Sequence, residues 1–92
     1  MPDRAERIAH ILTAQFAPLA LSVVDESHQH HGHAGASPDG QTHFHVALTS
    51  DRFAGLSRVS RSRLVHEALD EEFQTGLHAL RLTLAAPESA PA

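Results

Sequence analysis

The sequence contains no cysteine, lysine, tryptophan or tyrosine among its 92 residues. Without cysteine the chain can form no disulfide and can offer no thiolate to a metal. It also has no run of about 18 apolar residues, so we expect no membrane-spanning helix. Its first ten residues, MPDRAERIAH, are charged and include two acids, which is typical of neither a secretory signal nor a transit peptide. We therefore expect a cytoplasmic protein.

Positive charge is scarce as well. Seven arginines face eleven acidic residues, which gives a formal net charge of −4 when histidine is neutral. Nucleic-acid-binding proteins usually carry a basic surplus, because neutralisation of phosphates supplies much of their affinity. We therefore expect DNA binding to be weak and strongly salt-dependent at most.

Histidine, in contrast, is abundant, with nine residues in the chain. Four of them, His28, His30, His31 and His33, fall in the segment HQHHGHAG. Neutral imidazole binds Zn, Cu, Ni and Fe, and alternate residues of an extended segment share one face, so His28 and His30 can converge on one metal. A polar loop also tolerates histidine without using it. The segment therefore predicts metal binding but leaves the ligand open.

Apolar residues recur at helical or alternating spacing in five segments. They predict a helix at residues 3–16, strands at 19–25 and 43–50, a helix at 57–73 and a strand at 78–84. Asp3 and Glu6 resemble a capping box at the first helix, and Gly76 is a predicted cap after the second. The result is an α+β fold, a three-stranded sheet with helices packed on one face.

The connections between these elements complete the prediction. Residues 26–42 form a loop of unusual length for so small a domain, and such loops are usually functional or disordered. We expect residues 28–40 to be mobile, because they contain no large apolar side chain. Residues 1–86 form a single domain, and residues 87–92 are expected to be a disordered tail.

Alternation assigns the strand side chains to two faces of the sheet. The predicted core positions of the later strands are Phe44, Val46, Leu48, Leu80, Leu82 and Leu84, and those of the second helix are Leu64, Val65, Ala68, Leu69 and Phe73. His78 has the parity of Leu80, so we expect it on the core side at the start of its strand. There it is either a partly buried structural residue or a metal ligand on a rigid element. His43 and His45 fall on the opposite face.

The positions of the remaining histidines do not indicate a functional role. An exposed histidine on a sheet, such as His43 or His45, is unremarkable. His10 and His66 lie on predicted helices, and we expect both to be structural or solvated.

Five stretches in this order resemble the BolA family. They are VVDESHQH at 23–30, THFHVAL at 42–48, SDRFAGLS at 50–57, SRLVHEAL at 62–69 and GLHALRLTL at 76–84. The resemblance implies the order α-β-β-α-α-β, similar to a class II KH domain, with a short helix near Leu56 to Ser60. The chain lacks the Gly-x-x-Gly loop with which KH domains hold nucleic acid. It also has Ser62 between Arg61 and Arg63, where the family often has histidine.

The resemblance also implies a function. BolA-like proteins act without catalysis and pair with monothiol glutaredoxins, holding a [2Fe–2S] cluster between the two proteins. The glutaredoxin and a bound glutathione supply thiolates to the cluster, which apo iron–sulfur proteins then receive. By resemblance this chain would supply His78 and one histidine of the loop, His30, with His28 and His33 as near alternatives. Paired histidines on one iron have a precedent in Rieske centres.

Two other functions remain open. Some BolA relatives regulate transcription, and a DNA-binding role here would use Arg58, Arg61 and Arg63. Arg58 and Arg61 share a helix face and Arg63 does not, so this patch is thin. The third hypothesis is storage of Zn, Ni or Cu by the histidine-rich loop.

Overall fold

A computed structural model describes residues 3–27 and 41–87 of the chain. The elements are α1 (Arg4–Phe16), β1 (Ala20–Asp25), β2 (His43–Thr49), the 3-10 helix η2 (Asp51–Phe53), α2 (Arg58–Ala68), α3 (Asp70–Gln74) and β3 (Ala79–Ala85). The predicted order α-β-β-α-α-β is confirmed, and each strand lies within one residue of its predicted bounds.

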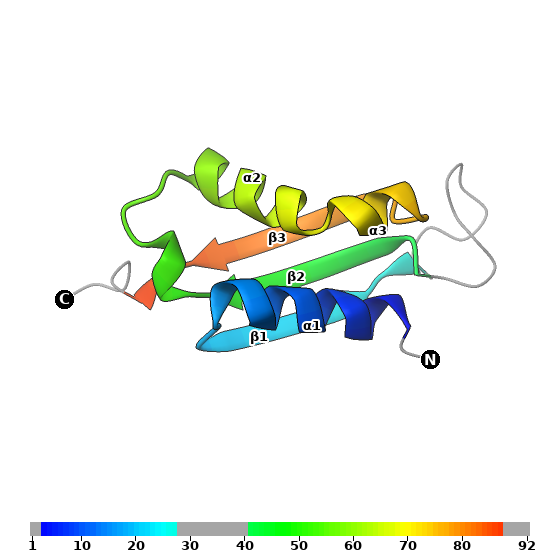
Figure 1. The fold of residues 1–92 in the computed structure, drawn as a ribbon, viewed down its shortest axis with the longest axis horizontal. Helices are drawn as coiled ribbons and strands as arrows, with labels where there is room; N and C mark the ends of the chain where they lie inside the picture. Colours follow the sequence, from blue (N-terminus) through cyan, green and yellow to red (C-terminus); the bar gives the residue numbers. More distant parts are fainter. Residues whose placement is uncertain (1–2, 28–40, 88–92) are drawn as a thin grey trace.

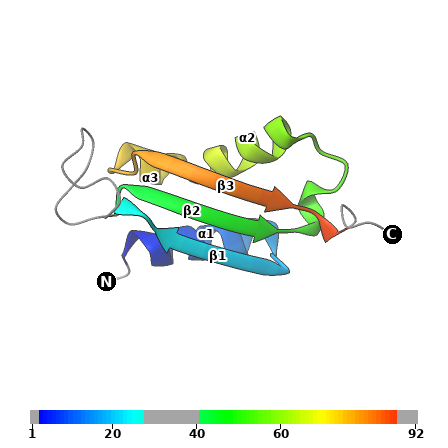
Figure 2. The same ribbon diagram turned by 180° about the vertical axis from the view of Figure 1, so that it is seen from behind.

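The three strands form one sheet in the order β1-β2-β3. β1 and β2 run antiparallel, whereas β2 and β3 run parallel. Figure 1 shows the helices on one face of this sheet, with α1 on the β1 side and α2 along β3. Seen from behind, the strands lie in front of all the helices (Figure 2), so the helices leave the opposite face uncovered. The predicted two-layer architecture is confirmed.

The core lies between the sheet and α1. Ile8 and Leu12 of α1 are fully buried, as is Val46 of β2. The register pairs Val46 with Leu82, which packs against the same core, so the predicted common face of β2 and β3 is confirmed. Phe53 is also fully buried, although it lies between the predicted elements of the sequence analysis. The helix η2 turns this ring inward onto the core.

The predicted helix at 57–73 is wrong in one respect, because it is divided into α2 and α3 at Leu69. Leu69 is fully buried and has φ −101° and ψ 15°, which bends the chain between the two helices. The short helix expected near Leu56 to Ser60 is also wrong. Ser57 instead caps α2, and its side chain accepts a hydrogen bond from the Ser60 N–H.

Leu64 does not belong to the buried stripe of α2, since its exposed fraction is 38%. Successive helical residues point about 100° apart. Because α2 packs on the sheet through Val65 and the following Leu69, the side chain of Leu64 turns away from the core. The prediction that Leu64 belongs to the core face of this helix is therefore wrong.

Gly76 follows the C-terminal end of α3 and is the cap that the sequence predicted. It has φ +131°, a backbone conformation that other residues rarely adopt. The Leu77 N–H donates to the Glu72 carbonyl at 2.8 Å, the hydrogen bond that defines a Schellman helix end. A Cβ at residue 76 would lie 2.8 Å from Arg4 Nη2. Gly76 therefore lets the chain leave α3 beside Arg4 and enter β3.

Three sequence predictions lie wholly or largely outside the described residues. They are the mobility of residues 28–40, the disorder of the tail at 87–92, of which only Pro87 is described, and the loop histidines as ligands. The similarity to a class II KH domain stays a prediction. No helix in the described part of the chain is long and apolar enough to cross a membrane.

We predict that Gly76→Ala destabilises the fold more than Gly55→Ala does. Both glycines have positive φ, but a Cβ at Gly55 meets nothing within 4 Å. We expect Gly55→Ala to cost about 1–2 kcal/mol of backbone strain. Gly76→Ala adds a clash with Arg4, for a total of about 2–4 kcal/mol. Urea unfolding of both variants measures the difference. Equal losses would contradict the packing of Arg4 against Gly76.

Candidate functional site

The structure brings two histidines together at the ends of β2 and β3. His43 is the first residue of β2, and His78 lies in the turn directly before β3. Their rings are stacked, with centroids 6.1 Å apart and planes inclined by 5°. His78 is exposed, so its predicted place on the core side is wrong. Because β3 begins only at Ala79, the alternation of that strand does not extend to His78.

The pairing of the two strands explains why these rings meet. In the parallel register His43 lies opposite Ala79. The carbonyl of Thr42 accepts hydrogen bonds from the N–H groups of His78 at 2.7 Å and Ala79 at 3.1 Å. The backbone of His78 is therefore fastened beside the residue that precedes His43.

Side-chain hydrogen bonds orient His43. Its Nδ1 lies 2.8 Å from the hydroxyl of Thr42, which in turn donates to Ser27 Oγ at 3.3 Å. Ser27 Oγ also accepts from the backbone N–H of Thr42 at 2.9 Å and of His43 at 3.1 Å. Ser27 and Thr42 are both buried. The imidazole of His43 is thus held by a buried hydroxyl network.

The same end of the sheet holds both ends of the histidine-rich segment. The Asp25 carboxylate accepts from the Ser27 N–H at 2.8 Å and from the Gln41 N–H at 3.0 Å. These two residues flank residues 28–40, which contain His28, His30 and His33. The segment that contains these histidines therefore leaves and rejoins the fold next to Thr42.

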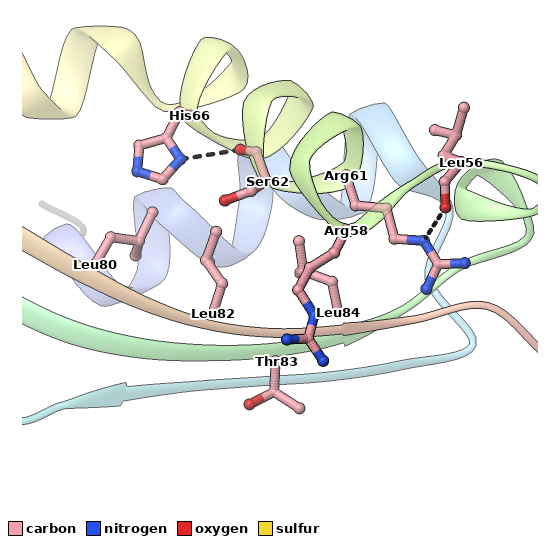
Figure 3. A pocket seen from close by; sticks show the side chains of 9 residues that line it. All are labelled: Leu56, Arg58, Arg61, Ser62, His66, Leu80, Leu82, Thr83 and Leu84. Carbon is pink, nitrogen blue, oxygen red and sulfur yellow. Dashed lines mark hydrogen bonds between the residues drawn. The ribbon is translucent and has the colours of Figure 1, made fainter. Parts of the chain in front are cut away.

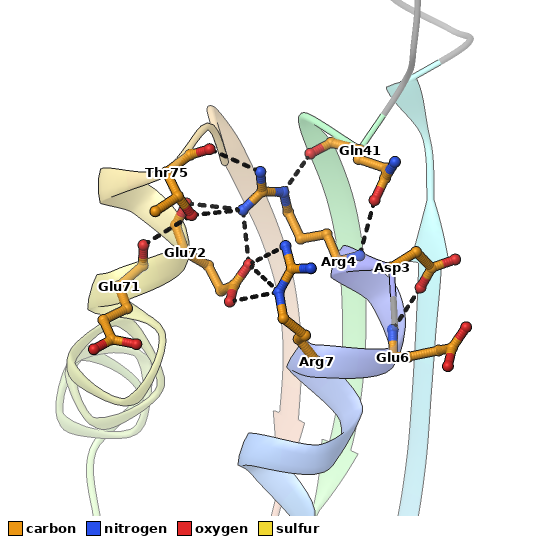
Figure 4. Close-up of polar contacts among 8 residues, drawn as sticks. All are labelled: Asp3, Arg4, Glu6, Arg7, Gln41, Glu71, Glu72 and Thr75. Atoms are coloured by element: carbon orange, nitrogen blue, oxygen red, sulfur yellow. Dashed lines mark hydrogen bonds and ion pairs between the residues drawn. The ribbon is translucent and has the colours of Figure 1, made fainter. Parts of the chain in front are cut away.

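An ion-pair network behind this site connects α1, α3 and Gln41 (Figure 4). Arg4 Nη1 lies 2.7 Å from Glu72 Oε1, and Arg7 Nε lies 3.1 Å from Glu72 Oε2. Arg4 also donates from Nε to the Gln41 carbonyl at 2.8 Å, and from its backbone N–H to Gln41 Oε1 at 2.8 Å. Arg4 therefore fixes the residue at which the chain returns from the histidine-rich segment.

The charge state of Glu72 depends on this network. Burial alone raises the pKa of its carboxyl group, but the hydrogen bond from Arg7 and the charges of Arg7 and Arg4 outweigh this effect. The pKa of Glu72 is consequently lower than its ordinary value of 4.5. The folded protein thus favours the ionised carboxylate that both arginines require.

A second feature is a groove of about 710 Å³ between α2 and β3 (Figure 3). It is lined by Leu56, Arg58, Arg61, Ser62, His66, Leu80, Leu82, Thr83 and Leu84. Arg58 and Arg61 thus share one surface, as the sequence predicted, and Arg63 lies outside the lining. Arg61 Nε donates to the Leu56 carbonyl at 3.1 Å. Of the two arginines, Arg58 is the more exposed.

The other described histidines are committed to structural contacts or lie on the surface. His66 Nδ1 is 2.9 Å from the Ser62 carbonyl, and its ring stacks on Phe73. His45 Nε2 is 3.0 Å from Thr83 Oγ1 on the uncovered face. His10 is exposed. The expected structural or solvated roles of His10 and His66 agree with these positions.

A family model for BolA-like proteins matches residues 12–89. The chain belongs to the BolA-like protein family. A chloroplast protein of Arabidopsis thaliana named BOLA1 is 42% identical over 91 residues, which cover 97% of this chain and 57% of that protein. The Escherichia coli protein named DNA-binding transcriptional regulator BolA is 46% identical over 77 residues, covering 84% of this chain and 70% of that protein.

Solved BolA structures share the fold. The BolA domain of SufE1 from Arabidopsis thaliana superimposes with a TM-score of 0.88 at 39% identity, covering 98% of this chain and 99% of that domain. BolA1 from the same plant gives a TM-score of 0.86 at 37% identity. This chain spans 57% of the full-length chloroplast BOLA1 protein and 24% of the SufE-like protein 1 that it also matches. Its length therefore corresponds to the BolA part of these longer proteins.

The histidine pair defines what this BolA site can do chemically. Within residues 3–27 and 41–87, no group of three or more His, Cys, Asp or Glu side chains is arranged to hold a metal ion. His43 and His78 offer two imidazoles, so a metal bound there must complete its coordination with ligands from residues 28–40 or from a partner. The sequence analysis did not predict the contact between His43 and His78, although a parallel pairing of β2 with β3 would have placed His43 next to Ala79.

We predict that Glu72→Gln destabilises the protein by about 2–3 kcal/mol at neutral pH, since hydrogen bonds to charged groups contribute about 1.5–3 kcal/mol. Because the pKa of Glu72 is lowered on folding, its stabilisation is fully present above about pH 4.5 and is lost as pH falls through the folded-state pKa. Unfolding curves of both proteins between pH 7 and 3 should therefore converge at low pH.

Glu71→Gln is the matched control for this experiment. Glu71 precedes Glu72 in α3 but is exposed, and its side chain points away from both arginines in Figure 4. We expect its loss to change stability by less than about 0.5 kcal/mol. A pH-independent difference between wild type and Glu72→Gln would contradict the role of the ionised carboxylate.

Proposed function

We propose that this BolA-like chain is a non-enzymatic adaptor that binds a [2Fe–2S] cluster together with a monothiol glutaredoxin and glutathione. His78 is its fixed ligand. The glutaredoxin cysteine and the glutathione thiol supply the sulfur ligands that a chain without cysteine cannot supply. The cluster is cargo, passed on to apo iron–sulfur proteins.

The observation that carries the proposal is the placement of His78. Its ring is exposed, while its backbone is fastened to Thr42 by a 2.7 Å hydrogen bond. A ligand on a rigid element needs little ordering when the metal binds. A second imidazole stands beside it, and the segment carrying His28, His30 and His33 is anchored at the same end of the sheet by Asp25.

The donor set also fits the chemistry. Imidazole nitrogen is a suitable ligand for iron, and two histidines replace two thiolates on one iron of a Rieske centre. Because His78 is exposed, the remaining coordination positions of a metal bound to it are open to ligands from a partner. These features support a shared cluster more than enclosed storage, for which the described residues provide no third ligand.

We predict that His78→Ala abolishes the cluster formed with glutaredoxin, glutathione, iron and sulfide. Single replacements of His28, His30 or His33 should be partly rescued by their neighbours, since these residues lie close together in the sequence. Visible circular dichroism of the mixed complex measures cluster formation. His45→Ala is the control, because His45 bonds Thr83 on the uncovered face. An unchanged cluster spectrum with His78→Ala would contradict the proposal.

The second candidate function is transcriptional regulation. It is favoured by the similarity to the Escherichia coli protein named as a DNA-binding regulator and by the two arginines that line the groove beside α2. The net charge of −4 opposes strong binding to phosphates. We therefore rank this function below cluster binding.

We predict weak DNA binding that falls steeply with salt. Arg58→Gln should reduce the slope of log affinity against log salt by about one, because each phosphate contact contributes about 0.9 to that slope. Arg63→Gln, outside the groove, is the control. Fluorescence anisotropy with labelled duplex DNA at 50–200 mM salt, about the range over which such contacts weaken, gives both values. Tight binding at the upper salt concentration, lost in Arg58→Gln, would reverse the ranking.

A further inference from the structure

We infer that the groove between α2 and β3 binds an extended acidic peptide of a partner protein, which adds to the sheet as a further strand beside β3. The groove is the one that Leu80, Leu82 and Leu84 line beneath α2. His78 lies outside this lining. The inference therefore concerns a surface separate from the cluster site and goes beyond the proposed function.

The outer edge of β3 is open to another strand. Within residues 3–27 and 41–87 the sheet has the order β1-β2-β3, so β3 is paired on one side only. A strand edge of this kind presents a row of backbone N–H and C=O groups with which another chain can pair. The seven residues of β3, ALRLTLA, contain no proline, and their register with β2 is continuous. The row of backbone groups is therefore uninterrupted.

The hydrogen bonds to β2 show which backbone groups of β3 point outward. The Ala79 N–H donates to the Thr42 carbonyl, and the Ala85 carbonyl accepts from the Ser50 N–H. The residues that bond a parallel neighbour recur at every second position, so the odd-numbered residues of β3 face β2. The N–H and C=O groups that point outward therefore belong to Leu80, Leu82 and Leu84.

The side chains of the same three leucines give the groove an apolar floor. They pack against the core, but each keeps part of its surface exposed. Figure 2 shows α2 extending past the edge of β3, so the helix covers the space that an added strand would occupy. The groove volume of about 710 Å³ lies within the range of about 300–1,000 Å³ common for ligand-binding clefts. A peptide bound there can bond the strand edge and bury apolar side chains at alternate positions, as in β-augmentation.

The charge of the groove favours an acidic peptide. Arg58 and Arg61 line it, and none of its lining residues is Asp or Glu. Arg58 is exposed, and its side chain extends from α2 toward β3 in Figure 3. Because α2 begins beside the C-terminal end of β3 (Figure 1), this positive charge lies at that end. A peptide that runs antiparallel to β3, the slightly more stable pairing, therefore has its acidic residue first and apolar residues at alternate positions after it.

The lining suits a peptide better than a nucleic acid or a second copy of this chain. Proteins that hold single-stranded nucleic acid stack bases on aromatic side chains. No Phe, Tyr or Trp lines this groove, and the ring of His66 is already stacked on Phe73. A second copy would bring the same two arginines and no carboxylate. An acidic, apolar strand complements both the charge and the leucine floor.

A fluorescein-labelled peptide, Ser-Glu-Thr-Val-Ser-Val-Thr, tests the inference with the full chain. We expect saturable binding by fluorescence anisotropy. Arg58→Glu should weaken it about tenfold, because the attraction of an exposed ion pair is replaced by repulsion of similar size. A peptide with Lys in place of Glu should restore binding to this variant. Arg63→Glu, which changes the net charge equally but lies outside the groove, is the matched control. It should bind like wild type, as should His78→Ala.

Amide hydrogen exchange measured by NMR tests the added strand itself. The N–H groups of Leu80, Leu82 and Leu84 should exchange fast in the free protein and become protected when the peptide binds. The odd-numbered residues of β3 should be protected in both states, because they bond β2. A peptide N-methylated at both valines keeps its side chains but cannot complete the hydrogen bonds to β3. We expect it to lose both the affinity and the protection.

Each contrary outcome overturns the inference and leaves the cluster proposal standing. No saturable binding, or equal weakening by Arg58→Glu and Arg63→Glu, shows that the groove does not recognise the peptide. Binding without protection of the three leucine amides excludes an added strand. If a labelled single-stranded oligonucleotide binds through Arg58 and the peptide does not, the groove holds nucleic acid. If those amides are already protected in the free protein and it sediments as a dimer, the edge pairs with a second copy.

Discussion

The site depends on the carbonyl of Thr42, which accepts the N–H groups of both His78 and Ala79. These two bonds begin the parallel pairing of β2 with β3, and they lie where the connection from α3 reaches the sheet. Parallel strands require a crossover connection, so the first residues of both strands lie at one end. That topology places His43 and His78 side by side, although 34 residues separate them in the sequence.

The ion pairs of Glu72 with Arg4 and Arg7 stabilise the arrangement of β2 and β3 at this end of the sheet. A buried carboxylate is costly unless it is paired and fully hydrogen-bonded, and here two arginines of α1 satisfy it. The same Arg4 bonds Gln41, and the backbone of Glu72 accepts the Leu77 N–H that closes the helix end at Gly76. The ion-pair network around Glu72 therefore holds α1 against α3. It also fixes the position of Gln41, which precedes Thr42, and of the turn at Gly76, which precedes His78.

Much of this fold could be predicted from local patterns, because periodicity reports burial. Alternation in HFHVALT correctly placed Phe44 and Val46 inside, and the positive φ of Gly76 matches its predicted cap. Predictions from local patterns were wrong or incomplete where tertiary contacts determine the structure. Phe53 is buried because η2 packs it on Phe16. Leu69 ends α2 although the apolar spacing typical of a helix continues past it. The contact between His43 and His78 follows from the register of β2 and β3. The partner and the cluster of the proposed function come from the family resemblance alone, because hydrophobic periodicity carries no information about either.

In the proposed function, the position of His78 lowers the entropic cost of binding a cluster. A ligand whose backbone is hydrogen-bonded to the folded sheet loses little conformational entropy when a cluster binds, because fixing the backbone of a free residue costs about 1–2 kcal/mol. The Thr42 carbonyl already holds the backbone of His78, so the backbone at this ligand is fixed when the protein folds and not when the cluster binds.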